Sequence, residues 1–93
     1  MAENSDEEER RQEEMERLEL TAIEWMALKE VRALKSLGDT NGLDTIKNKV
    51  KQLIAEEYDE YSINVPEETL ERDAARKIEE ALKIARKERM AAF

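Results

Sequence analysis

Apolar residues recur every three or four positions along three long stretches of this chain, a spacing typical of helices with one buried face. The pattern predicts helices over about residues 6–37, 42–60 and 65–90. Because the connections between them are short, each helix is expected to run back along its predecessor. The predicted fold is therefore all-α, an up-down-up three-helix bundle.

The apolar residues of the second and third predicted helices each fall on a single arc. On a straight α-helix each arc spans about 140°, which suits a helix that touches two neighbours. These residues form the predicted core: Leu43, Ile46, Val50, Leu53, Ile54, Tyr58 and Tyr61, then Leu70, Ala74, Ile78, Ala81, Leu82 and Ala85.

The first predicted helix differs because its apolar residues lie on two stripes. On a straight α-helix the two stripes together span more than about 200°, which is more than two packing neighbours can cover. The excess predicts a surface that something further must cover. One stripe holds Leu20, Ile23, Ala27, Val31 and Leu34, and the other holds Met15, Ala22, Met26, Ala33 and Leu37, continued by Leu18 and Trp25.

The residues left over after packing define a candidate protein interface: Leu18, Thr21, Trp25, Leu28 and Arg32. Their spacing is seam-like, and tryptophan and arginine are enriched at binding hot spots. The interface could join two copies in a homodimer or seat the helix in a groove of another protein. In the remaining alternative, Trp25 closes one end of the core within the chain.

The start of the first helix is marked by charge. Ser5 followed by Glu8 fits a capping box, so the helix is expected to begin near Asp6. Nothing apolar anchors it before Met15. Residues 1–14 are therefore expected to be a charged extension, frayed or a helical overhang, and residues 15–93 to form the bundle.

The other helix ends are marked by turn residues. Gly38 is expected to end the first helix in the left-handed conformation, and Thr40 or Asn41 to cap the second. Asn64 fits a cap for the third helix, with Pro66 in its first turn.

Composition narrows the class of protein. The chain has 93 residues, of which 43% are charged, with two glycines and no cysteine, as expected of a single domain of long helices. A net charge of −8 disfavours nucleic acid and anionic membranes as partners. No stretch resembles a signal peptide or a transmembrane segment, so a soluble protein is expected, cytoplasmic by default.

The residue types present also limit the chemistry. Without histidine or cysteine, the chain cannot build the usual nucleophile–base pairs, thiolate zinc sites or Glu-x-x-His di-iron sites. Carboxylate pairs at helical spacing could bind a cation, but on glutamate-rich helices they are typical of solvated faces. We therefore expect no enzyme activity, catalytic residue, metal, cofactor or small-molecule substrate. The pairs are Glu13/Glu16, Glu56/Glu60 and Glu67/Glu71.

The whole chain resembles engineered or de novo designed three-helix bundles. No single motif carries the resemblance, which lies in regular caps, alternating Glu and Lys/Arg surfaces, and a core of Leu, Ile, Val and Ala. The longer connections "GDTNGLDT" and "DEYSINVPEE" are less regular than such designs. The resemblance implies a scaffold or a binding module.

A second, local resemblance concerns residues 41–54. The stretch "NGLDTIKNKVKQLI" is similar to the long stem helix of influenza hemagglutinin, whereas Lys47 and Lys51 depart from that pattern. The similarity implies a scaffold that carries an antibody epitope. The shared residues are Asn41, Asp44, Ile46, Asn48, Lys49, Val50 and Ile54.

Together these features favour a non-catalytic helical scaffold or protein-binding module that presents a face of the first helix to a partner or to itself. The alternatives are a small natural acidic adaptor or subunit that assembles through the same helix, and the epitope scaffold.

Overall fold

The computed structural model describes residues 2–92, and these residues contain helices and no strand. The all-α prediction is confirmed. The predicted single helix over residues 6–37 is wrong, because the chain forms two helices there. The four helices are α1 (Ala2–Leu18), α2 (Ala22–Arg32), α3 (Thr40–Glu60) and α4 (Glu67–Ala91).

A Schellman motif ends α1. Glu19 has a φ of 55°, in the left-handed region. Its N–H donates to the carbonyl oxygen of Glu16 at 3.3 Å, and the N–H of Leu20 donates to that of Met15 at 2.8 Å. This pair of hydrogen bonds satisfies carbonyls that the helix end leaves free and turns the chain sharply. Glycine is the usual residue here, so a glutamate gives little warning of the turn in the sequence.

A capping box starts α2 immediately afterwards. The N–H of Glu24 donates to Thr21 Oγ1 at 3.3 Å, and the N–H of Thr21 donates to Glu24 Oε1 at 2.9 Å. Both orphan donors at the start of the helix are thereby satisfied. The chain thus closes one helix and opens another within three residues, Glu19 to Thr21. The straight-helix angles that defined the two stripes do not apply across this break.

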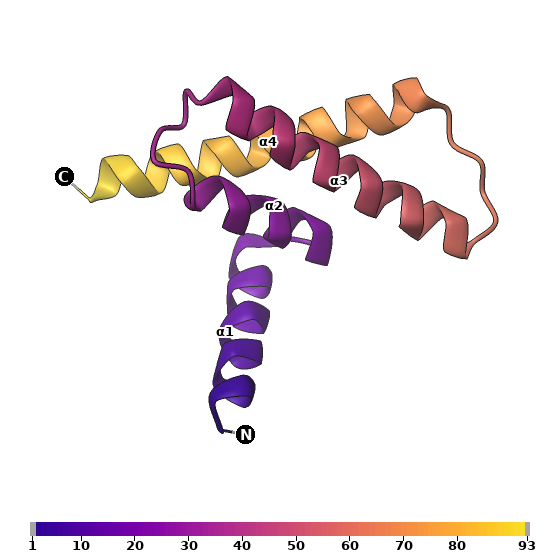
Figure 1. The fold of residues 1–93 in the computed structure, drawn as a ribbon. Coiled ribbons are helices and arrows are strands. Elements are labelled where there is room, and N and C mark those ends of the chain that lie inside the picture. Colours follow the sequence, from indigo (N-terminus) through magenta and orange to yellow (C-terminus); the bar gives the residue numbers. More distant parts are fainter. Residues whose placement is uncertain (1, 93) are drawn as a thin grey trace.

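Helices α2, α3 and α4 pack against one another, whereas α1 packs against α2 alone among the described helices. Figure 1 shows α1 projecting away from the other three helices. The shared core is apolar throughout. It consists of Ala27, Leu28 and Val31 from α2, Ile46, Val50 and Ile54 from α3, and Ala74, Ile78, Ala81 and Ala85 from α4.

The core predicted for the last two helices is largely confirmed, since its members are buried or half-buried apart from one. The exception is Tyr61, which is 70% exposed. The helix α3 ends at Glu60, and Tyr61 lies in the turn that follows. Its side chain therefore leaves the arc that the helical period assigned to it.

The predicted helix ends need several corrections. The helix α2 ends at Arg32, well before Gly38, and neither glycine adopts a positive φ. Asp39 caps α3 in place of Thr40 or Asn41, since its Oδ1 accepts from the N–H of Gly42 at 3.0 Å. An aspartate one residue earlier supplies the same acceptor, so the type of cap was predicted but not its position.

Two further caps differ from prediction. The helix α4 begins at Glu67 with Pro66 as its N-cap residue and no side-chain cap, so Asn64 does not cap it. The helix α1 begins at Ala2, so the predicted start near Asp6 is wrong. The side chain of Ser5, on which the predicted capping box depended, lies outside the described residues. None of the described helices is long and apolar enough to cross a membrane.

Candidate functional site

The five residues of the predicted interface do not form one free surface. Leu28 is 0% exposed and belongs to the core, so it cannot contact a partner in this fold. Leu18 is half-buried against the core, and Thr21, although exposed, is held in the capping box of α2. Trp25 and Arg32 are half-buried and are engaged within the chain.

Trp25 lies under α1. The guanidinium carbon of Arg11, from α1, is 6.0 Å from the centroid of the indole, and Lys29 Nζ is 5.3 Å from it. Both cations face the electron-rich ring, an arrangement that stabilises by about 0.5–2 kcal/mol depending on exposure. The indole Nε1 is buried and has no acceptor among the described residues. The second apolar stripe was expected to need a further packing partner. For Trp25, α1 of the same chain supplies part of that contact.

Arg32 joins three helices. Its Nε donates to Glu88 Oε1 of α4 at 2.9 Å, and its second terminal nitrogen pairs with Glu88 Oε2 at 2.5 Å. It also forms an ion pair with Glu14 of α1. The hydrogen bond from Arg32 lowers the pKa of Glu88 below its ordinary value. Arg32 thus links α1 and α4 to α2, so its guanidinium is engaged in ion pairs within the chain.

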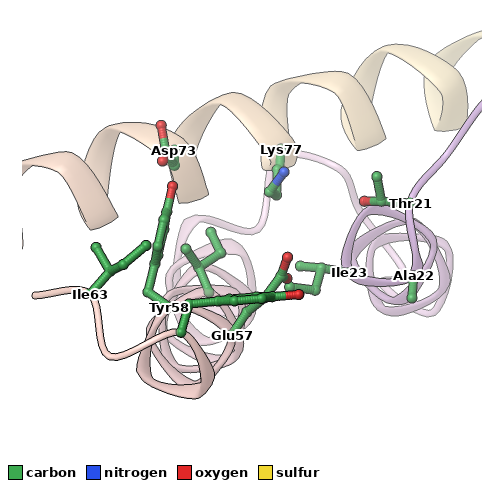
Figure 2. A pocket seen from close by; sticks show the side chains of 10 residues that line it. Thr21, Ala22, Ile23, Glu57, Tyr58, Ile63, Asp73 and Lys77 are labelled. Carbon is green, nitrogen blue, oxygen red and sulfur yellow. The ribbon is translucent and has the colours of Figure 1, made fainter. Parts of the chain in front are cut away.

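An open apolar groove lies elsewhere, where the start of α2, the end of α3 and α4 meet. Its volume is about 380 Å³, and Figure 2 shows its lining seen from close by. Beside it Tyr61 is 70% exposed and Ile63 48% exposed, whereas Ile54 is 5% exposed and belongs to the core. The lining residues are Thr21, Ala22, Ile23, Ile54, Glu57, Tyr58, Tyr61, Ile63, Asp73 and Lys77.

The rim of this groove is mostly acidic. Glu57, from α3, and Asp73, from α4, line it, and Glu60, the exposed last residue of α3, directly precedes Tyr61. Lys77 is the one basic residue of the lining. Figure 2 shows Asp73 and Lys77 along α4, with Glu57 across from them on α3. An apolar floor with an acidic rim can hold a segment that carries both apolar and basic side chains.

One carboxyl beside the groove has a shifted pKa. Burial raises the pKa of Glu24, but its hydrogen bonds with the backbone and side chain of Thr21 and the charge of Lys77 outweigh that effect, so the pKa is lowered. Glu24 therefore stays ionised at neutral pH and holds the start of α2 in place at the edge of the groove.

Sequence reasoning missed this groove because the helical period placed Tyr61 in the core. The sequence nevertheless contains a signal of an exposed apolar surface. Apolar residues flank the acidic residues of the stretch 56–60, and Ile63 lies beyond the end of the helical pattern. The capping box of α2 was also predictable from the sequence, since Thr21 and Glu24 have the required spacing.

The described residues include no group of three or more aspartate, glutamate, histidine or cysteine residues that could hold a metal ion. One of the carboxylate pairs considered above, Glu67 and Glu71, is occupied by Lys51, whose Nζ is 3.2 Å from Glu71 Oε1 and forms an ion pair with Glu67 as well. The hydrogen bond from Lys51 lowers the pKa of Glu71.

These features define an all-α protein with a small apolar groove at one end of its helical core. No protein-family model matches the chain, and no curated protein and no solved structure matches it either.

Proposed function

We propose that this chain is a non-catalytic helical protein-binding module that receives an amphipathic, basic helical segment in the groove beside Tyr61 and Ile63. The observation that carries the proposal is the exposure of these two large apolar side chains, 70% and 48%, next to a hollow of about 380 Å³. Apolar side chains that gather around a hollow at the surface are typical of interaction sites.

The charge around the groove selects the chemistry of the partner. Glu57 and Asp73 in the lining, and Glu60 beside Tyr61, attract a segment that carries lysine or arginine beside its apolar face. The interaction should weaken as salt is added, because exposed charges are screened within about 8 Å at physiological ionic strength. An acidic segment would be repelled.

In this proposal α2, α3 and α4 act as an up-down-up three-helix unit, and α1 is an arm that covers Trp25. The groove therefore takes the partner-binding role that the sequence had assigned to a face of the first helix. Only the start of α2 lines this groove. An engineered scaffold and a natural acidic adaptor would both use it in this way.

The epitope scaffold gains no support from the fold. Ile46, Val50 and Ile54, the apolar residues shared with the hemagglutinin stem helix, are 3%, 2% and 5% exposed. An antibody would reach only the polar shared residues.

A synthetic helical peptide of alternating leucine and lysine patches tests the proposal. Titrated into isotope-labelled protein, the peptide should shift the amide signals of Tyr58, Tyr61 and Ile63 more than those of other residues. The double substitution Tyr61→Ala with Ile63→Ala should weaken binding by about tenfold or more, because it removes the apolar contacts.

A matched control is Met26→Ala, which removes an exposed apolar side chain, 41% exposed, on a face away from the groove. It should leave the affinity unchanged. Peptide binding that is insensitive to the groove substitutions, or equally sensitive to Met26→Ala, would contradict the proposal.

A further inference from the structure

The end of α4 has the chemistry that the groove is proposed to receive. Residues 83–92 contain four basic residues and one acidic residue; Arg89 is hydrogen-bonded to the end of α2 in its own chain, whereas Lys83, Arg86 and Lys87 are exposed. Met90 is 77% exposed, the most exposed of the large apolar residues described, and Arg86 and Lys87 beside it are exposed as well. An apolar side chain flanked by cations on a helix complements an apolar hollow flanked by carboxylates.

Within one copy of the chain this segment cannot reach the groove. Lys77, on the groove, and Met90 both belong to α4, and the thirteen helical steps from one to the other correspond to roughly 20 Å along the helix. Figure 1 shows the C-terminal end of α4 on the opposite side of the molecule from the α3–α4 connection. The segment is therefore available only to the groove of another molecule.

We propose that the occupant of the groove is residues 83–92 of a second copy of this chain. The inference rests on the proposed binding role of the groove and names its partner. In an antiparallel pair related by a two-fold axis, each copy places the basic end of its α4 against Glu57, Glu60 and Asp73 of the other. The two-fold axis makes the two contacts equivalent, so each copy gives its basic segment to its partner's groove and receives the partner's segment in its own.

The antiparallel pair is favoured over a one-way chain of molecules for a geometric reason. A two-fold pair uses both grooves and both basic segments and is closed, whereas a one-way contact leaves one groove and one segment free and would continue into a filament. A parallel pair would bring like charges together at each end and is disfavoured.

Sedimentation of the full chain over a concentration series tests the proposal through a charge swap. One variant carries Glu57→Lys and Glu60→Lys, and the other carries Arg86→Glu and Lys87→Glu. Alone, each variant brings like charges together, so its self-association should weaken by about tenfold or more. An equimolar mixture pairs a basic groove with an acidic segment and an acidic groove with a basic segment. The mixture should therefore recover the dimer to within about threefold of the native affinity.

A control variant with Glu9→Lys and Glu13→Lys, on exposed residues of α1, makes the same change in net charge as the groove variant and should leave the dimer unchanged. Circular dichroism of each variant shows whether the fold is retained. If either swap variant fails to fold, the double substitution Tyr61→Ala with Ile63→Ala replaces it and should also weaken the dimer.

The outcomes separate the two proposals. If the chain stays monomeric at every concentration while the leucine–lysine peptide still binds the groove, self-association is overturned and the binding role stands. If the dimer forms but the charge-swap variants retain it, or if their mixture does not restore it, another surface joins the copies and the inference is overturned. If neither the peptide nor a second copy engages the groove, both proposals fail.

Discussion

The guanidinium of Arg89, near the end of α4, donates a hydrogen bond to the carbonyl oxygen of Leu34 at 2.6 Å. It also donates to the carbonyl oxygens of Lys35 at 3.3 Å and Arg32 at 3.4 Å. These carbonyls lie at and beyond the end of α2, where a helix leaves its acceptors without intrahelical partners. One side chain therefore caps α2 and ties the α2–α3 connection to the far end of α4.

Arg89→Ala should lower the free energy of unfolding by about 1–2 kcal/mol, because charge-assisted hydrogen bonds to otherwise unpaired carbonyls are lost. Urea denaturation followed by circular dichroism measures the change. Arg72→Ala, which removes an exposed arginine near the start of α4, is the control and should change the stability by less than about 0.5 kcal/mol. Equal losses in the two variants would show that the contacts of Arg89 contribute nothing beyond its charge.

Leu28→Ala should lower the free energy of unfolding by about 2–5 kcal/mol, because it opens a cavity in the core. Leu28 is 0% exposed, and its neighbour Met26 is 41% exposed. Met26→Ala should therefore cost much less, about 0.5 kcal/mol. Thermal and urea unfolding of the two variants give the comparison. A small loss of stability in Leu28→Ala would instead indicate that this side chain lies at the surface, as the straight-helix angles predicted.

Trp25→Ala should loosen α1 more than it loosens the rest of the protein. The indole lies against Arg11 of α1, and its loss removes a cation–π contact of about 0.5–2 kcal/mol. Amide hydrogen exchange should rise in α1 while the amides of α3 keep their protection. Tyr61→Ala should leave exchange in α1 unchanged. A uniform rise across all helices after Trp25→Ala would place the indole in the shared core.

Ser62→Gly should raise the free energy of unfolding by up to about 1 kcal/mol. Ser62 has a φ of 56°, in the left-handed region, which glycine adopts without a steric penalty. Ser62→Val at the same position should lower the stability by about 1 kcal/mol or more, because a β-branched residue is strained there. Urea unfolding should therefore show opposite signs for the two variants. Changes of the same sign would contradict a left-handed turn at this position.

Acid should destabilise the protein partly through Glu88 and Glu24. Both have pKa values below the ordinary 4.5 in the folded protein, Glu88 through its hydrogen bond with Arg32 and Glu24 through Thr21 and Lys77 despite its burial. A carboxyl with a lowered pKa contributes its stabilisation in full above its unfolded pKa. That contribution is lost as the pH falls through the folded value.

The midpoint of thermal unfolding should accordingly fall between about pH 5 and about pH 3. Glu88→Gln should make this fall shallower and lower the stability at neutral pH by at most about 1 kcal/mol, since the pair is partly exposed and screened. Glu79→Gln, on the exposed face of α4, is the control and should leave the pH profile unchanged. An identical acid profile in Glu88→Gln would contradict the role assigned to the Arg32 pair.

Sequence alone determined the helical class and the buried faces of the last two helices. The helical period is a local property of the backbone, so residues such as Ile46 and Val50, or Ala74 and Ile78, share a face wherever the helix lies. A helix needs to bury such a face, and the core contains all four of these residues. No distant part of the chain was needed to reach this conclusion.

Tertiary structure decided what the first helical stretch does. The left-handed turn at Glu19 is not encoded by a glycine, and it rotates everything after it relative to the straight-helix angles. Leu28 lies in the core beside Ala27 and Val31, on the face of α2 that packs against α3 and α4, whereas Trp25 contacts Arg11 of α1. Both positions are set by contacts between helices and not by the local pattern.

The groove was likewise decided by the packed structure. Tyr61 lies just past the end of α3, where the helical period no longer sets the direction of the side chain. The hollow beside it exists because α2, α3 and α4 meet there, and residues as distant in sequence as Thr21 and Asp73 line it. A periodic pattern reports which side chains share a face of one helix. Only the packing of three helices determines where their faces leave a gap.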